Sequence, residues 1–225
     1  MSTTEQVSST VEEYLEAIYR LQERNGAAKT TELAKQLNVA LGTITNTVES
    51  LEKQSLIVHQ PYKGVRLTAK GRKIALSVVR RHRLSECLVV DILKVEWGKA
   101  HDAACKLEHA FADKELIEPL EKALGNPKTC PHGNPIPSAS GEVAEERSET
   151  LASLDEGEKG VIVKVTDERP DILHYLSKLG IKLGEQVLVQ EKAPFNGPIM
   201  VEIGDSNIAL GQNVALVIWV RKIKA

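Results

Sequence analysis

Two short helical patterns separated by a tight turn constrain this chain more than any other feature. They occupy residues 29–38 and 43–53, with four residues between them. In the second pattern Ile44, Val48 and Leu51 recur at helical spacing and form an apolar stripe. Two helices connected in this way form a helix-turn-helix. The sequence therefore predicts this motif in the N-terminal third of the chain.

The second of these helices begins with short polar side chains that suit hydrogen bonding to nucleic-acid bases. They are Thr43, Thr45, Asn46 and Thr47. The N-terminal end of such a helix enters the major groove, where asparagine pairs with adenine and threonine contacts a thymine methyl group or a phosphate. We therefore expect these four residues to contact DNA.

Residues 57–68 alternate apolar and polar side chains around a turn, which predicts a two-stranded hairpin. Lys63 lies at its tip and Arg66 on its return strand, where their charges would contact backbone phosphates. A basic hairpin in this position is a wing, so a winged helix-turn-helix is predicted. The alternative is the same fold used for protein contacts alone.

The distribution of charge agrees with a DNA-binding N-terminal part. Residues 1–83 carry 13 Lys and Arg against 8 Asp and Glu, whereas the remaining 142 residues carry 16 against 23. A basic third attached to an acidic body is typical of a nucleic-acid reader joined to a regulatory domain. Taken alone, the imbalance is weak evidence.

Metal-binding residue types share one face of a predicted helix at residues 99–112. Cys105, Glu108 and His109 point the same way, and His101 lies one turn earlier. A thiol, a carboxylate and an imidazole on one stripe can bind a divalent transition metal. The alternative is a solvated helix face with a buried cysteine. His82 and Glu86, spaced i and i+4, fit either a ligand pair or a helix ion pair.

The helical patterns of the middle third carry more apolar residues than a small winged domain can bury. We infer a dimerisation surface, because symmetric readers of two half-sites need one. The apolar residues on the predicted helices at 99–112 and 113–124 are Ala104, Leu107, Phe111, Leu116, Ile117, Leu120 and Leu124.

After a linker rich in Pro, Gly, Ser and Glu, the chain changes character. Short apolar runs at 160–166, 186–190, 198–202, 206–210 and 215–220 predict five strands, with one helix at 170–179. Five strands in about 75 residues predict a small β-barrel. The predicted fold class is therefore α+β, with a winged helix-turn-helix, an all-helical dimerisation domain and a barrel.

The sequence also bears on the compartment. It has no apolar run of 18 residues, and its polar N-terminus lacks a signal core, so we expect a cytoplasmic protein with no membrane partner. The sequence has an odd number of cysteines, Cys87, Cys105 and Cys130. This favours free thiols or metal ligands over a disulfide framework.

Several separated motifs, in order along nearly the whole chain, resemble the diphtheria toxin repressor family of metal-activated transcriptional repressors. They are Glu12-Glu13-Tyr14-Leu15, Arg81-His82-Arg83-Leu84, the segment His101–His109 and Gly133-Asn134-Pro135-Ile136-Pro137. The barrel resembles the SH3-like domain of this family and ferrous-iron transport protein A. The resemblance implies domains at 1–73 (DNA binding), 74–140 (metal binding and dimerisation) and 151–225 (SH3-like), with a linker at 141–150.

The resemblance implies a primary metal site made of Glu13, Cys105, Glu108 and His109. Iron-sensing members place a methionine at the position of Glu13. Manganese-sensing members place carboxylates there and at the position of Cys105, and their second carboxylate on the first helix corresponds to Glu16. The set is thus a hybrid of the two types.

An ancillary site is implied by the same resemblance. Its ligands would be His82, Glu86, Cys130 and Asp167, with His101 nearby. Glu168 is the alternative to Asp167, because the alignment slips there, and Cys87 is expected in the core.

The expected function is a repressor that binds double-stranded operator DNA as a homodimer when Fe²⁺ occupies its sites. Mn²⁺ is the alternative, and Co²⁺, Ni²⁺ and Zn²⁺ are expected as substitutes in vitro, since thiolate and imidazole ligands favour the later metals. Two other functions stand beside this one: a constitutive DNA binder with a structural metal site, and a zinc enzyme. Against the enzyme, the sequence lacks H-E-x-x-H, so we expect neither catalysis nor a small-molecule substrate.

Overall fold

The computed structural model describes residues 7–60, 63–144 and 147–223. The described chain forms two compact units. The first runs to Arg81 and includes Pro137–Glu142, and the second consists of His82–Ile136 and the residues from Val143 onward. The three predicted domains and their linker divide the chain differently and stay a prediction.

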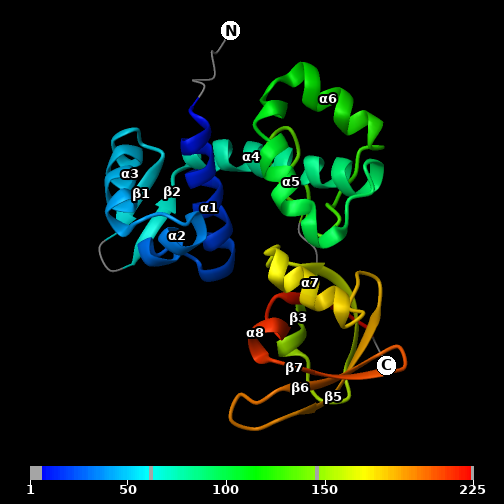
Figure 1. The fold of residues 1–225 in the computed structure, drawn as a ribbon. Coiled ribbons are helices and arrows are strands. Elements are labelled where there is room, and N and C mark those ends of the chain that lie inside the picture. Colours follow the sequence, from blue (N-terminus) through cyan, green and yellow to red (C-terminus); the bar gives the residue numbers. More distant parts are fainter. Residues whose placement is uncertain (1–6, 61–62, 145–146, 224–225) are drawn as a thin grey trace. The chain divides into compact units, whose positions relative to one another are not determined.

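The first unit contains three helices, a hairpin and the first part of a fourth helix (Figure 1). They are α1 (Ser9–Asn25), α2 (Thr30–Leu37), α3 (Leu41–Lys53), β1 (Ile57–Gln60) and β2 (Gly64–Leu67), after which α4 (Ala69–Cys87) begins. Ser8 caps α1 by accepting a hydrogen bond from the backbone N–H of Val11, and Gly26 ends the helix in the left-handed conformation. The strands pair in an antiparallel register from Ile57–Leu67 to Gln60–Gly64.

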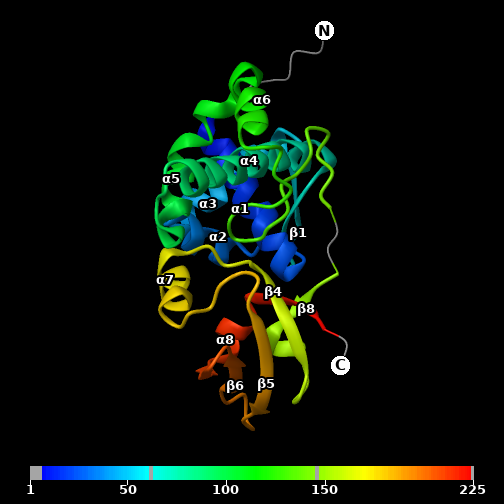
Figure 2. The same ribbon diagram turned by 90° about the vertical axis from the view of Figure 1, so that its right-hand side faces the viewer.

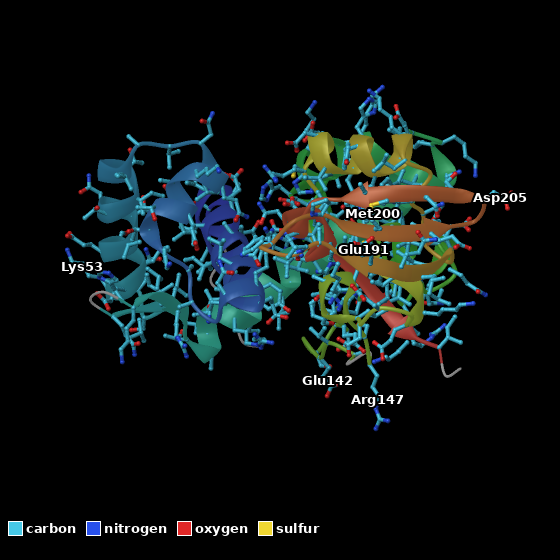
Figure 3. All side chains as sticks on the ribbon, turned by 90° about the horizontal axis from the view of Figure 1, so that it is seen from below. Lys53, Glu142, Arg147, Glu191, Met200 and Asp205 are labelled. Carbon is cyan, nitrogen blue, oxygen red and sulfur yellow. The ribbon has the colours of Figure 1, made fainter. Side chains whose placement is uncertain are left out.

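The helix-turn-helix differs from the sequence expectation by two residues. Asn38 ends α2 in the left-handed region, with φ of 53°. Ala40 then adopts the extended conformation of an N-cap, so α3 begins at Leu41 rather than Thr43. Ile44, Val48 and Leu51 are buried as expected. Figure 3 shows Lys53 at the outer end of α3.

The helical part of the second unit is more broken than the sequence suggested. After α4 come a π-helical turn η1 (Leu88–Ile92), the 3₁₀ turn η2 (Trp97–Lys99), α5 (Ala100–Leu107), the 3₁₀ turn η3 (Ala110–Ala112) and α6 (Lys114–Ala123). The expected helix at 99–112 thus ends at Leu107, because Phe111 leaves the helical region with ψ of 20° and Asp113 starts α6 as its N-cap. Figure 2 shows α5 beside α4.

The rest of the second unit is a six-stranded antiparallel sheet in the order β3-β8-β4-β5-β6-β7 (Figures 1 and 2). The strands are β3 (Glu149–Thr150), β4 (Lys159–Val165), β5 (Gln186–Lys192), β6 (Ile199–Ile203), β7 (Ser206–Leu210) and β8 (Ile218–Lys222). The turn η4 (Leu151–Ser153) and helices α7 (Pro170–Lys178) and α8 (Gln212–Ala215) complete it. Its apolar core runs from Leu151 to Val220. Figure 3 shows Asp205 at the turn joining β6 to β7.

The α+β fold class is confirmed, with two differences in the barrel. Glu149 and Thr150, expected in the linker, form β3 by pairing with Val220 and Trp219 of β8. The last strand starts at Ile218 instead of residue 215, because the preceding residues form α8. In the described part of the chain, no helix combines the length and apolarity needed to cross a membrane.

Candidate metal centre

A cluster of buried and half-buried metal-binding side chains lies at the end of α4 within the second unit. Its members come from five segments that are distant in the sequence. They are His82 and Glu86 on α4, His101 and Cys105 on α5, Glu108 directly after α5, Cys130 and His132 in the loop after α6, and Glu168 between β4 and α7.

His82 lies at the centre of this cluster and is fully buried. Its Nδ1 is 2.5 Å from Glu108 Oε2, and its Nε2 is 3.2 Å from Glu86 Oε1 and 3.1 Å from His101 Nδ1. Because α4 and α5 pack together, the His82 imidazole contacts residues that were predicted for two different sites, the primary and the ancillary one.

Cys105 and Glu108 meet through His82. The Cys105 thiol is 3.9 Å from His82 Nδ1 and 3.7 Å from His101 Nε2, and these three side chains form one group with metal-binding potential. His109 Nε2 lies 3.4 Å from Glu108 Oε1. Cys105 and Glu108 thus both contact His82, and His109 contacts Glu108, but no group of candidate ligands among the described residues unites Cys105, Glu108 and His109.

Cys130 and His132 form another part of the cluster, and both are buried. His132 Nδ1 is 3.2 Å from Glu86 Oε1, and these three residues join Glu168 in a second group of candidate ligands. His132 Nε2 lies 3.3 Å from the carbonyl oxygen of Trp97. A second hydrogen bond of this kind fixes the tautomer and orientation of a metal-binding imidazole.

Glu168, rather than Asp167, reaches the cluster. Glu168 Oε2 is 4.0 Å from His82 Nε2 and 3.6 Å from His101 Nδ1. Asp167 instead accepts hydrogen bonds from the Arg169 guanidinium, whose Nε is 3.0 Å from Asp167 Oδ1. Neighbouring residues of this segment thus face different surroundings. Glu168 therefore replaces Asp167 in the ligand set that we propose.

The carboxylates and imidazoles of the cluster shift each other's pKa values. Burial would lower the pKa of His82, but Glu86, Cys105 and Glu108 raise it well above its ordinary value. Burial and Glu168 act to raise the pKa of Glu86, but His82 and His132 lower it overall. In the metal-free chain the imidazolium charges therefore balance the carboxylates, as a bound metal cation would. This fits a cation site.

The two thiols differ in their ease of ionisation. Burial opposes ionisation of Cys105, yet His101 and His82 lower its pKa. Burial, Glu86 and Glu168 together raise the pKa of Cys130 well above its ordinary value. Cys130 therefore becomes a thiolate ligand only if a metal displaces its proton. Cys87 is buried as expected, and burial raises the pKa of its thiol to about 12.

The remaining predicted ligands and DNA contacts belong to the first unit. Glu13 is exposed on α1, whereas Glu16 is buried and accepts hydrogen bonds from Arg20. Thr43, Thr45 and Asn46 are exposed at the start of α3, and Thr47 is half-buried. Lys63 and Arg66 are exposed on the hairpin. These positions leave the predicted base and phosphate contacts accessible.

Sequence reasoning missed two residues of the cluster. His132 follows the predicted ligand Cys130 by two residues, and a histidine at this spacing from a cysteine ligand is itself a signal. Asn134 donates hydrogen bonds from Nδ2 to Glu168 Oε1 and to the carbonyl oxygen of Val165. Its supporting role depends on a tertiary contact that no local pattern indicates.

Three family models match the chain in order. They describe an iron dependent repressor N-terminal DNA binding domain (residues 6–65), an iron dependent repressor metal binding and dimerisation domain (68–138) and a FeoA domain (149–222).

Two relatives from different genera match over almost their whole length. The iron-dependent repressor IdeR of Mycobacterium leprae is 31% identical over 95% of this chain and 97% of its own. The diphtheria toxin repressor of Corynebacterium glutamicum is 30% identical over 96% and 97%. Among solved structures, a manganese-dependent transcriptional repressor in complex with manganese is 34% identical over 95% of this chain and 100% of its own, with a TM-score of 0.87.

Proposed function

Because this chain belongs to the iron-dependent repressor family, we propose that a divalent metal ion switches it to a form that binds operator DNA as a homodimer. The observation that carries this proposal is the buried cluster around His82, whose carboxylates, thiols and imidazoles are ligand types for transition metals. The chain's place in a family of metal-responsive repressors supports the same function.

The residues of the cluster fit a metal ion. Glu86 Oε2 is fully buried and, within the described chain, has no hydrogen-bond donor. A buried acceptor without a donor is costly, and a cation removes that cost. We propose that Cys105, Glu108 and His109 hold one ion and that the ancillary ligands hold another.

We propose that Glu13 completes the first set, as the family resemblance implies, with Glu16 as an additional carboxylate. Both residues lie on α1, in the same unit as the helix-turn-helix. Glu13 would therefore let the metal act on the DNA-binding unit. A ligand shifts a conformational equilibrium only through its different affinity for the two states.

Fe²⁺ is the proposed metal and Mn²⁺ the alternative. The thiolate of Cys105 and the imidazoles favour Fe²⁺ over Mn²⁺ in the Irving–Williams order, while the carboxylates suit both. The relative from Mycobacterium leprae is named an iron-dependent repressor, and a structural neighbour is described as a complex with manganese.

Removal of metal is expected to abolish specific DNA binding. The metal-free protein is titrated anaerobically with Fe²⁺ and, separately, with Mn²⁺. Both metals should raise its affinity for operator DNA, and Fe²⁺ should do so at a lower free concentration than Mn²⁺. Fluorescence anisotropy of labelled operator DNA measures this. The reverse order of metals would identify a manganese sensor. Metal-independent binding would overturn the switch and leave a constitutive DNA binder with a structural site.

Replacing Glu13 by alanine is expected to weaken metal-activated operator binding by about tenfold to a hundredfold, the range of coupling energies between linked sites. The fold should persist, because the side chain is exposed. Glu23→Ala is the matched control, since Glu23 is also an exposed glutamate on α1. If Glu13→Ala and Glu23→Ala respond to metal alike, Glu13 has no part in the switch.

A further inference from the structure

We propose that the ancillary cluster binds two divalent ions side by side, with the carboxylates of Glu86 and Glu168 shared between them. This inference rests on the proposed metal dependence and changes the number of ions that each chain holds. The other ligands are His82 and His101 for one ion, and Cys130 and His132 for its neighbour.

The distances between the donor atoms favour a site for two ions over a site for one. His82, Glu86, His101 and Glu168 form one group, and Glu86, Cys130, His132 and Glu168 form another. Within each group the donor atoms lie within 4.8 Å of one another. Among the described residues, no group unites all six. Metal–ligand bonds of about 2.0 to 2.3 Å keep the ligands of a single ion within about 4.6 Å of each other, so one ion would leave part of the cluster unused.

His132 is held in the orientation of a metal ligand. Its Nε2 lies 3.3 Å from the Trp97 carbonyl oxygen, which requires the proton on that nitrogen and directs Nδ1 towards Glu86. The Trp97 indole contacts the same ring, with 5.0 Å between centroids, and its Nε1 donates to the Pro131 carbonyl oxygen. This support is separate from the contacts that hold His82 and His101.

The shared carboxylates are placed as bridges. Glu86 Oε1 is 3.2 Å from both His82 Nε2 and His132 Nδ1, while its buried Oε2 has no hydrogen-bond donor within the described chain. Glu168 directs Oε2 towards His82 and His101, and its Oε1 accepts a hydrogen bond from Asn134. Each carboxylate therefore contacts residues from both sides of the cluster.

The charges also suit two ions. Two carboxylates and the Cys130 thiolate carry three negative charges in a fully buried setting, so a single divalent ion leaves one of them unbalanced. Carboxylates shared by a pair of ions about 3.5 to 4 Å apart are a recurring arrangement in two-metal sites. A pair of divalent ions leaves a net charge of +1.

Metal counting tests the proposal. Purified full-length protein is dialysed to equilibrium against Co²⁺ alone, and bound cobalt is measured for the wild type, His101→Ala, His132→Ala and the double variant. Each single variant should lose one ion per chain, and the double variant should lose two. If the single variants and the double variant all lose the same one ion, the cluster is a single site and the proposal is wrong. Circular dichroism checks that each variant is folded.

A second readout is decided by the wild-type protein, so its outcome does not depend on how a variant folds. With Mn²⁺ alone, electron paramagnetic resonance of the wild type should show two exchange-coupled ions. As a further check, Cys130→Ser or His132→Ala should leave uncoupled ions. An uncoupled spectrum from fully loaded wild type would overturn the two-ion centre. Neither measurement involves DNA. Two coupled ions without metal-dependent operator binding would refute the proposed function alone, and a single ion with such binding would refute this inference alone.

Discussion

Replacing His82 by alanine is expected to lower the free energy of unfolding of the metal-free chain by about 3 to 5 kcal/mol, the usual cost of removing one partner of a buried ion pair. The side chain is fully buried, and its two ring nitrogens contact Glu86 and Glu108. Without it, the buried carboxylates of Glu86 and Glu108 each lose a contact with an imidazole whose pKa is raised. Urea unfolding in the presence of a chelator measures the change.

His174→Ala is the control for this prediction. His174 belongs to the same unit but is more than half exposed, and its nearest carboxylate is that of Glu96 at 3.9 Å. An exposed pair at this distance contributes little to stability. Equal losses in the two variants would contradict the central role of His82.

The effect of His82→Ala should depend on pH. Because the pKa of His82 is raised on folding, its contribution is complete below its ordinary value of 6.5 and is lost as the pH rises through the folded value. Because the pKa of Glu86 is lowered, its contribution is complete above 4.5 and is lost as the pH falls. The difference between wild type and variant should therefore be largest between about pH 4.5 and 6.5.

Replacing Gly133 by alanine is expected to lower the free energy of unfolding by about 2 to 5 kcal/mol, the sum of a left-handed backbone penalty and steric overpacking. Gly133 has φ of +81°, and an added Cβ would lie 2.0 Å from the Val163 carbonyl oxygen and 2.7 Å from Lys164 Cα. The loop must therefore move away from β4. Thermal unfolding measures the loss of stability.

The same substitution should weaken metal binding at Cys130 and His132. The carbonyl oxygen of His132 accepts a hydrogen bond from the backbone N–H of Val165, so displacing the loop also displaces these ligands. Gly125→Ala is the matched control, since Gly125 has φ of +77° but no atom within 4 Å of an added Cβ. If both variants lose the same stability and keep the same metal affinity, close packing against β4 is not important.

The fold could be predicted largely from local patterns. The helical spacing of Ile44, Val48 and Leu51 predicted the buried face of α3. The alternation of apolar and polar residues predicted both strands of the hairpin. The errors occurred where local geometry overrode periodicity. Phe111 leaves the helical region although apolar spacing continues through it, and Glu149 and Thr150 become a strand only because β8 offers them a partner.

The candidate site was less accessible to sequence reasoning. Spacing on one helix predicted Cys105 and Glu108 as ligands of one ion, and this stays a prediction, whereas the family resemblance supplied Glu86 and Cys130, which the structure places in one group of candidate ligands. The contact between His82 and Glu108 spans 26 residues and depends on how α4 packs against α5, which periodicity cannot show. Asp167 and Glu168 are adjacent carboxylates, and the sequence does not show that Arg169 pairs with Asp167 while Asn134 donates a hydrogen bond to Glu168.

The chain returns to the first unit at Pro137–Glu142, so the two units alternate along the sequence. The Arg80 guanidinium donates a hydrogen bond to the Pro137 carbonyl oxygen at 2.7 Å, and Gly141 lies against Leu76, so this segment belongs to the first unit. A fragment that stops at Arg81 would lack it and would expose the surface of α4 that it covers. A single proteolytic cut or truncation therefore cannot release either unit intact.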